Sequence, residues 1–171
     1  MSLEVVPLRA MAHPVRLRML SLLTVTAMSA AELARELDLT QANASYHLRS
    51  LVRAGLVTPA GEERVRGGVA KRYRYDVNAP APVIKDAAGE PLFAEALATE
   101  MVRRSRQRRP DARGLMTDAE LWVDPEVFED ARARMADATR RLHLEARPPR
   151  TEGTMRVSAT VSLFEMEDGR E

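Results

Sequence analysis

The stretch TQANASYHLRSLVRAGLV, residues 40–57, decides the fold. Its leucines return every third or fourth position, and at about 100° per residue the apolar side chains gather on one face of a helix. That face consists of Ala44, Leu48, Leu51 and Val52, and we expect it to pack on the core. The other face carries Gln, Asn, Ser, Tyr and Arg, which either stand in water or bind a ligand.

The ends of this helix are marked in the sequence. Thr40 can accept a hydrogen bond from the backbone N–H of Asn43, as an N-cap residue does. Gly55 follows Ala54, in the place where a glycine in the left-handed conformation ends a helix. The pattern therefore predicts a helix over 40–54 with a cap at each end.

Two helices are predicted before this one and a hairpin after it. The first helical pattern is interrupted at Pro14, because proline is best placed in the first turn of a helix. Ser29 and Glu32 form a capping-box pattern at the start of a short second helix. Downstream, two extended runs flank Gly67-Gly68, which is typical of a β-hairpin. Three helices followed by a hairpin predict a winged helix-turn-helix.

The runs LRAMAHPVRLRMLSLL and MSAAELARELDLTQANASYHLRSLVRAGLV together resemble the ArsR-type winged helix-turn-helix regulators. The resemblance covers roughly residues 8–77 without a gap. It implies a homodimeric DNA-binding regulator. In such a regulator the 40–54 helix enters the major groove, and the hairpin touches the DNA backbone or the minor groove.

The resemblance does not extend to metal sensing. Metal-sensing members of the family use cysteines near the DNA-binding helices, or Asp and His on the C-terminal dimer helix. This chain has no cysteine, and its corresponding helix, PLFAEALATEMVRRSRQRR, has no histidine. His13, His47 and His143 have no partner at i, i+4, and we expect a structural or phosphate-contacting role for His47. We therefore expect no metal ligands and no cofactor.

The polar face of the 40–54 helix has a composition suited to DNA. A merely solvated face would be filled with Glu and Lys, yet no acidic residue lies between Thr40 and Gly61. Amide side chains can pair with adenine, and arginine can pair with guanine, in the major groove. We expect base contacts from Gln41, Ser45, Tyr46 and Arg49, and backbone contacts from Thr40, Asn43 and Arg53.

The predicted hairpin is basic. Residues 64–76 contain five cations and one acid. Charges also protect a solvated strand edge from aggregation, but that alternative leaves the scarcity of acids unexplained. We expect phosphate contacts from Arg64, Arg66, Lys71, Arg72 and Arg74.

The second half of the chain has the pattern of a dimerisation segment. A stretch rich in Ala and Pro, 78–91, divides the chain into residues 1–78 and residues 79–171. The arginine run 103–109 is either a solvated helix end or a second contact surface, and the sequence leaves both open. The helix predicted from Pro91 to about Arg108, which contains this run, has an apolar surface too broad for a single contact. This surface predicts a dimer interface at Leu92, Phe93, Leu97 and Met101.

Beyond that helix the pattern predicts strand, helix and strand. Residues 119–123 and 155–165 read as strands able to pair, and a helix starts after Asp124 between them. The rare aromatic residues Trp122 and Phe128 are expected in a core rather than around an effector.

Composition limits the function classes. The 171 residues include no cysteine and no apolar run long enough for a signal peptide or a membrane span, so we expect a cytoplasmic protein without membrane contact. Residues 1–78 hold eleven cations and seven acids, a net charge of +4, which favours a polyanion as partner of this part. The carboxylates at 118–126 lack the His, Lys or Ser partners of an active site, so we expect no enzyme.

The expected fold class is α+β, mainly helical, with a winged helix-turn-helix followed by a dimerisation helix and a small strand–helix–strand segment. The expected function is transcriptional regulation, with repression as the expected direction, by a homodimer that binds an inverted-repeat operator in double-stranded DNA. Two alternatives stay open. One is a winged-helix module that binds protein, and the other is a regulator that binds a small-molecule effector in residues 79–171.

Overall fold

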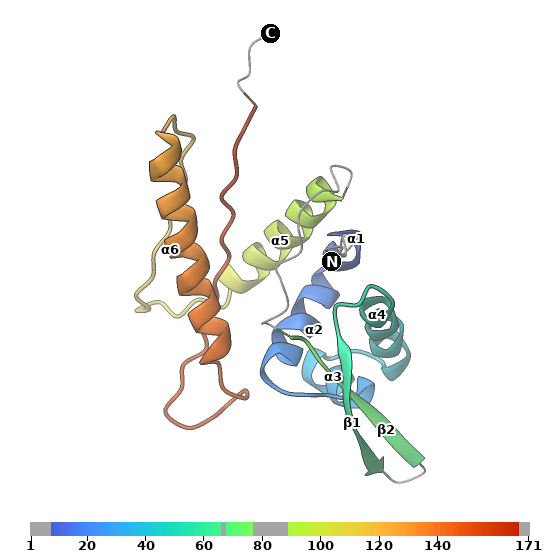
Figure 1. Cartoon of the computed structure of the whole chain (residues 1–171). Helices are drawn as coiled ribbons and strands as arrows, with labels where there is room; N and C mark the ends of the chain where they lie inside the picture. The colour runs from blue at the N-terminus through green and yellow to red at the C-terminus, as the bar shows by residue number, and fades with distance from the viewer. Residues whose placement is uncertain (1–7, 66–67, 77–88, 168–171) are drawn as a thin grey trace.

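The computed structural model describes residues 8–65, 68–76 and 89–167, which are mainly helical with one small sheet (Figure 1). The elements in chain order are α1 (Leu8–Met11), α2 (Pro14–Val25), α3 (Ala30–Leu37), α4 (Gln41–Arg53), β1 (Thr58–Val65), β2 (Gly68–Arg74), α5 (Glu90–Ser105) and α6 (Pro125–Leu144). Helices α2 to α4 followed by the β1–β2 hairpin make a winged helix-turn-helix. The predicted α+β, mainly helical fold class is therefore confirmed.

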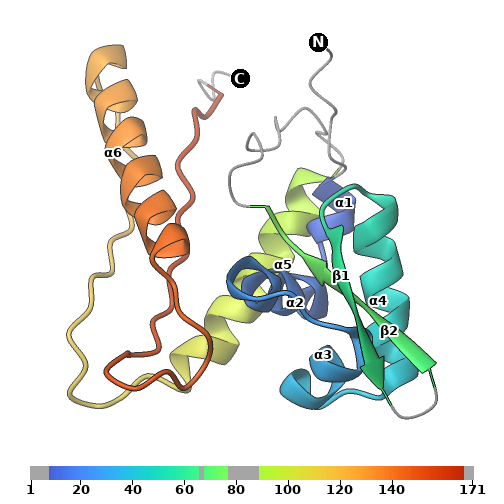
Figure 2. The same cartoon turned by 60° about the horizontal axis from the view of Figure 1, so that its bottom comes forward.

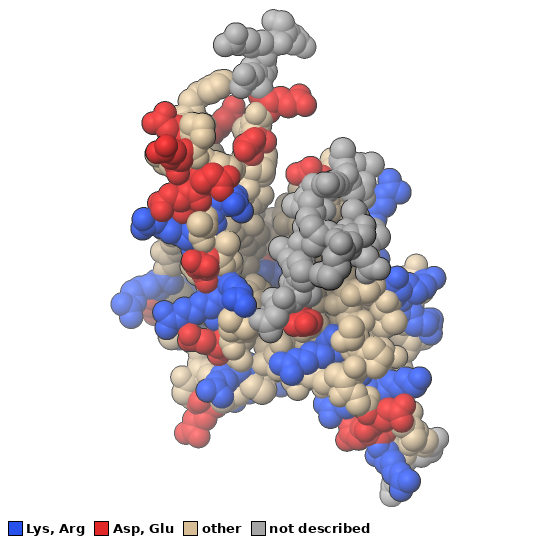
Figure 3. Space-filling view, in the orientation of Figure 1, with Lys and Arg blue, Asp and Glu red and all other residues tan. Residues whose placement is uncertain are grey.

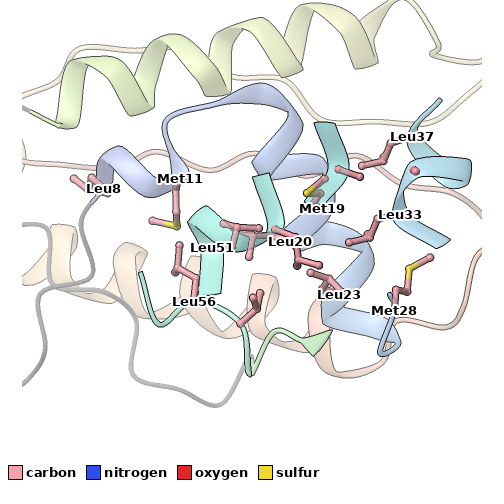
Figure 4. Packing of buried hydrophobic residues seen from close by; sticks show 14 residues of the cluster. Leu8, Met11, Met19, Leu20, Leu23, Met28, Leu33, Leu37, Leu51 and Leu56 are labelled. Atoms are coloured by element: carbon pink, nitrogen blue, oxygen red, sulfur yellow. The ribbon is translucent and has the colours of Figure 1, made fainter. Parts of the chain in front are cut away.

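The core lies where α2, α3 and α4 meet (Figure 4). Met19 and Leu23 of α2, Leu33 of α3 and Leu51 of α4 are fully buried there. Burying an aliphatic side chain of this size contributes about 1.5–3 kcal/mol. This aliphatic core therefore holds the three helices in fixed mutual positions.

The helix ends follow the predicted signals. Ser29 and Glu32 form a complete capping box, in which the Ser29 N–H donates to the Glu32 carboxylate at 2.7 Å and the Glu32 N–H donates to the Ser29 hydroxyl at 3.3 Å. The Asn43 N–H donates to Thr40 Oγ1 at 3.2 Å. Gly55 has a φ of 69°, in the left-handed region that ends helices. These caps are confirmed.

The hairpin is tied to the helices by its second strand. Tyr73 exchanges two backbone hydrogen bonds with Met28, of 3.0 and 2.9 Å, which joins β2 to the α2–α3 connection. The Tyr75 N–H donates to the carbonyl of Leu23 at 3.0 Å. The wing is thus fixed to the same helix that carries much of the core.

α5 packs across α1 and α2. Phe93 lies against the helix-turn-helix core, and Ala96 is buried. Glu100 is buried too, and its carboxylate accepts hydrogen bonds from Arg103 at 2.7 to 3.1 Å and from Arg104 at 3.3 Å. Burial raises the pKa of Glu100, but the two guanidinium groups outweigh burial and hold the pKa below its ordinary value. Two arginines of the 103–109 run therefore have a structural role.

The strands predicted in the C-terminal segment are not formed in the described residues. Residues 119–123 and 155–165 are extended but do not pair, and α6 lies between them (Figure 2). The helix itself is confirmed, with Asp124 as its N-cap residue. Trp122 is 85% exposed, so its expected place in a core is wrong, and Phe128 is only half-buried. Since no residue of α6 is buried, this part of one chain lacks a core on which two strands could pack.

The hairpin tip and most of the 78–91 linker lie outside the described residues, and with them the predicted backbone contact Arg66. The division into residues 1–78 and 79–171 stays a prediction. Within the described ranges, no helix has the length and apolar character needed to cross a bilayer.

Candidate nucleic-acid interface

α3, a three-residue turn and α4 form the helix-turn-helix. Asp38 in the turn adopts a left-handed φ of 55°. The N–H of Leu39 donates to the carbonyl of Ala34 at 2.9 Å, which closes the end of α3. This tight turn sets the direction in which Thr40 starts α4.

α4 has one buried and one exposed face, as predicted. Ala44, Leu48 and Leu51 are buried, whereas Val52 is only partly buried. His47 belongs to the buried face and is 7% exposed. The helix therefore rests on the core along its apolar stripe and leaves its polar side open.

The predicted base-contacting residues lie on the exposed side of α4. Gln41, Ser45 and Arg49 follow at steps of four residues and form one ridge along the helix. Tyr46 is 57% exposed beside this ridge, and Arg53 continues it. Within the described chain no protein group bonds the side chains of Gln41, Arg49 or Arg53. These donors and acceptors are available to a ligand.

Thr40 and Asn43, predicted to contact the DNA backbone, mark the exposed N-terminal end of α4. The Thr40 hydroxyl accepts the Asn43 N–H and keeps its own proton for a further acceptor. A helix N-terminus also favours negative charge, because its N–H groups and dipole point outward. The start of α4 can therefore bind a phosphate as well as a base.

Two histidines meet beneath α4. The ring centroids of His13, the N-cap residue of α2, and His47 lie 4.4 Å apart. His13 Nδ1 accepts the N–H of Val15 at 3.2 Å. His47 Nδ1 and Arg16 Nε are buried, and neither has a hydrogen-bond partner in the described chain. No local pattern in the sequence predicts this contact, because the two histidines are far apart along the chain.

Both histidines are held neutral by their surroundings. Burial lowers the pKa of His47, and the neighbouring His13 and Arg16 lower it further. Burial followed by Arg16 lowers the pKa of His13 from its ordinary 6.5. In the described residues no three His, Asp or Glu side chains are grouped as metal ligands would be. The contact between the two rings packs α4 on the N-cap residue of α2.

The wing carries both signs of charge (Figure 3). Arg64, Lys71 and Arg74 are exposed, as a phosphate contact requires. However, Lys71 lies directly opposite Glu62 in the β1–β2 register, and Glu63 follows on the same strand. These two carboxylates make the potential of the hairpin less positive than the five cations of residues 64–76 alone would make it.

Arg72 has a structural role that the sequence did not indicate. Its guanidinium donates to the carbonyl of Ala27 at 2.6 and 3.1 Å and to Glu32 at 3.1 Å, and lies 3.5 Å from Glu63. Burial raises the pKa of Glu32, but hydrogen bonds from Ser29 and the charge of Arg72 outweigh it, so the pKa lies below its ordinary value. The predicted DNA contact of Arg72 is not tested by these bonds, which join the wing to the start of α3.

The predicted dimer residues of α5 divide into two groups. Phe93 packs on the core of its own chain, and Leu97 is partly buried. Leu92 and Met101 are about half exposed, at 47% and 52%. One side of α5 is thus used within the chain, while the other side is open.

Comparison with known proteins identifies the first part of the chain. Residues 11–60 match a family model described as a helix-turn-helix domain. The matched residues span α2, α3, α4 and the start of β1. No curated protein matches the chain. The chain therefore contains a helix-turn-helix domain, which indicates a DNA-binding regulator.

Proposed function

We propose that the protein is a sequence-specific transcriptional regulator, a repressor, that binds double-stranded DNA as a homodimer. The observation that carries the proposal is the exposed ridge of α4, where Gln41 and Arg49 have no bonding partner in the described chain. An amide and a guanidinium on one ridge are the groups that read adenine and guanine in the major groove. A ridge that served only solubility would need neither.

In the proposed complex α4 lies in the major groove. Gln41, Ser45, Tyr46 and Arg49 contact base edges, and each good bidentate pair gives about 1–3 kcal/mol of discrimination between bases. The backbone contacts come from both ends of α4 and from the wing, that is from Thr40, Asn43, Arg53, Arg64, Arg66, Lys71 and Arg74. Arg72 holds the wing in place and is the least available of the predicted contacts.

A second copy supplies the second half of the site. The open side of α5, with Leu92 and Met101 exposed, supports a contact between two copies. A twofold dimer presents two α4 helices to successive major grooves about 34 Å apart, so the operator is an inverted repeat. The symmetry of the DNA site then mirrors the symmetry of the protein.

Selection of bound sequences from random double-stranded DNA, followed by gel shift of the enriched site, tests the proposal. We expect an inverted repeat, with an affinity that falls as salt rises by about 0.9 in log–log slope for each phosphate contacted. A protein-binding winged-helix module would enrich no sequence and show no salt-dependent affinity. That result would end the DNA-binding proposal.

A further inference from the structure

The C-terminal part of the chain exposes an unusual amount of apolar surface. Residues 115–167 hold fifteen of the 21 large apolar side chains that are exposed in the described chain. Leu115 is 92% exposed, Trp122 85% and Met155 81%. Monomeric proteins seldom leave apolar patches of more than a few hundred Å² in water, so this surface indicates a partner.

Two extended segments in this region have free backbone groups. Within the described residues, no backbone–backbone hydrogen bond joins residues 113–123 or 155–167 to any other segment. An extended segment with unpaired N–H and C=O groups is a template for strand addition. α6 separates the two segments within one chain, so they do not satisfy each other there (Figure 2).

The side chains of these segments alternate as in strands that bury one face. In residues 155–163 the odd positions are apolar, Met155, Val157, Ala159, Val161 and Leu163, whereas the even positions are polar. The shorter run 119–123 has Ala, Leu and Val at its odd positions, and the apolar Trp122 lies on its other face. The strict alternation over residues 155–163 is typical of a half-buried strand, although in one chain both faces are exposed.

We propose that a second copy of the chain covers this region, with residues 119–123 of one copy pairing as a strand with residues 155–165 of the other. α6 then covers the apolar face of the sheet formed between the copies. This inference rests on the homodimer of the proposed function and adds a second contact between the copies to the one proposed at the open side of α5. It does not depend on DNA binding.

A second copy fits better than an unrelated partner because each chain carries both complementary segments. In a twofold arrangement the same exchange occurs twice, so each of the four segments gains a strand neighbour along one edge and the assembly closes at two copies. Fifteen large apolar side chains offer on the order of 1,000 Å² per chain, which exceeds the roughly 800 Å² per partner of a standard interface. The exposed apolar surface is therefore large enough for an interface of standard size.

The charges in this region are also complementary between copies. Residues 124–130 contain four acids and no cation, and residues 103–109 contain five arginines. Within the described chain no ion pair joins these two sets, whose ion pairs are all local, such as Glu100 with Arg103 and Asp130 with Arg134. The acidic groups gather at the end of α6 and the tail beside it (Figure 3). The proposed strand exchange can bring this acidic N-terminal end of α6 near the basic C-terminal end of the partner's α5.

Light scattering on the full chain during size exclusion tests the inference. We expect wild type at twice the 19.1 kDa of the chain. Val161→Lys places a charge on the apolar face and should raise the dimer dissociation constant by tenfold or more, because an unpaired charge is costly to bury. Thr160→Lys, on the polar face of the same strand, is the matched control and should leave the constant unchanged. A monomeric wild type, or a Val161→Lys chain that dimerises like wild type, overturns the inference.

A cross-linking experiment identifies the contact directly and does not depend on the lysine variant folding. Because the chain has no cysteine, Ala119→Cys and Ala159→Cys each introduce a single thiol. A mixture of the two variants should give a cross-linked pair with a short bis-maleimide, since facing or diagonal positions on neighbouring strands lie within about 8 Å. Ser158→Cys, on the other face, should react with Ala119→Cys much less. Equal yields for both mixtures, or none, contradict the pairing, whereas a specific cross-link in a protein that binds no DNA would refute only the proposed function.

Discussion

His13 and His47 lie ring against ring, 4.4 Å between centroids, and so connect the N-cap of α2 to the buried side of the helix proposed to read DNA. Tyr46, the neighbour of His47, packs edge-on against the same ring with its centroid 5.2 Å away. Two titratable side chains, His13 and His47, therefore lie on the buried side of α4, opposite its exposed polar face. Protonation of either ring would place a charge at the contact between α4 and the N-cap residue of α2.

The histidine pair predicts that stability falls as pH drops below 6.5. Burial, before any neighbouring charge, lowers the pKa of both rings from 6.5, so the unfolded chain binds more protons in the window below that value. The free energy of unfolding should therefore decrease as pH falls through the window and level off below the folded-state pKa. Urea unfolding from about pH 7.5 to about pH 5 measures this above the range where carboxylates titrate.

His47→Gln should flatten this pH dependence, whatever its effect on stability at neutral pH. His143→Gln is the control, since His143 lies exposed near the end of α6 and should leave the dependence as in wild type. An unchanged slope in the His47 variant would refute the role given to the pair.

Arg72→Ala should destabilise the fold by about 1.5–3 kcal/mol, the range for hydrogen bonds to charged groups. The variant removes the bonds to Ala27 and Glu32 and leaves the Ala27 carbonyl without its guanidinium donor. Lys71 directly precedes Arg72, but its side chain is exposed, so Lys71→Ala should change the free energy of unfolding by less than about 0.5 kcal/mol. Thermal or urea unfolding of the two variants compares them, and equal losses would contradict the structural role of Arg72.

The two left-handed positions flanking α4 should respond in opposite directions. Gly55→Ala should cost about 1–2 kcal/mol from backbone strain alone, because φ is 69° and no atom lies within 4 Å of the added Cβ. Asp38→Gly relieves the same kind of strain at φ 55° but adds freedom to the unfolded chain, which leaves a gain of roughly 0.5 kcal/mol. Chemical unfolding measures both. Changes of the same sign would show that local conformation does not control these turns.

Arg49→Ala should weaken binding to the selected site by about 1–3 kcal/mol and relax one base position in each half-site. Arg53→Ala should weaken all sequences alike and lower the salt slope by about 0.9. The two arginines lie one helical turn apart on the same ridge, so each serves as control for the other. Repeating the DNA selection with each variant separates the two roles. An Arg49→Ala chain with unchanged base preference would show that Arg49 does not contact a base.

Local signals in the sequence were enough to predict the helix-turn-helix. Ser29 with Glu32, Thr40 and Gly55 act within a few residues of themselves, so their caps could be recognised without knowledge of the fold. The buried stripe of α4 follows from helical spacing in the same way. For His47 the sequence left a structural and a phosphate-contacting role open, and the structure places the ring on the buried stripe.

Contacts between distant segments could not be predicted. The partners of Arg72 lie on the α2–α3 connection and on α3, and no local pattern distinguishes a cation that holds a wing in place from one that binds phosphate. The prediction that residues 119–123 and 155–165 pair as strands within the chain was wrong for a related reason. Alternation shows that a segment suits a sheet, but it does not identify the neighbouring strand.

The bridge between Met28 and Tyr73 has a consequence for control. It fastens the wing to the connection that follows α2, while α4 rests on α2 through the core. The helix proposed to read the groove and the hairpin proposed to contact the DNA backbone are therefore held in one fixed arrangement. Adjusting the angle between them is then no route to switching. In the proposed homodimer, a signal that weakens operator binding is then expected to act on the separation or the relative rotation of the two copies, and therefore on the contacts between chains.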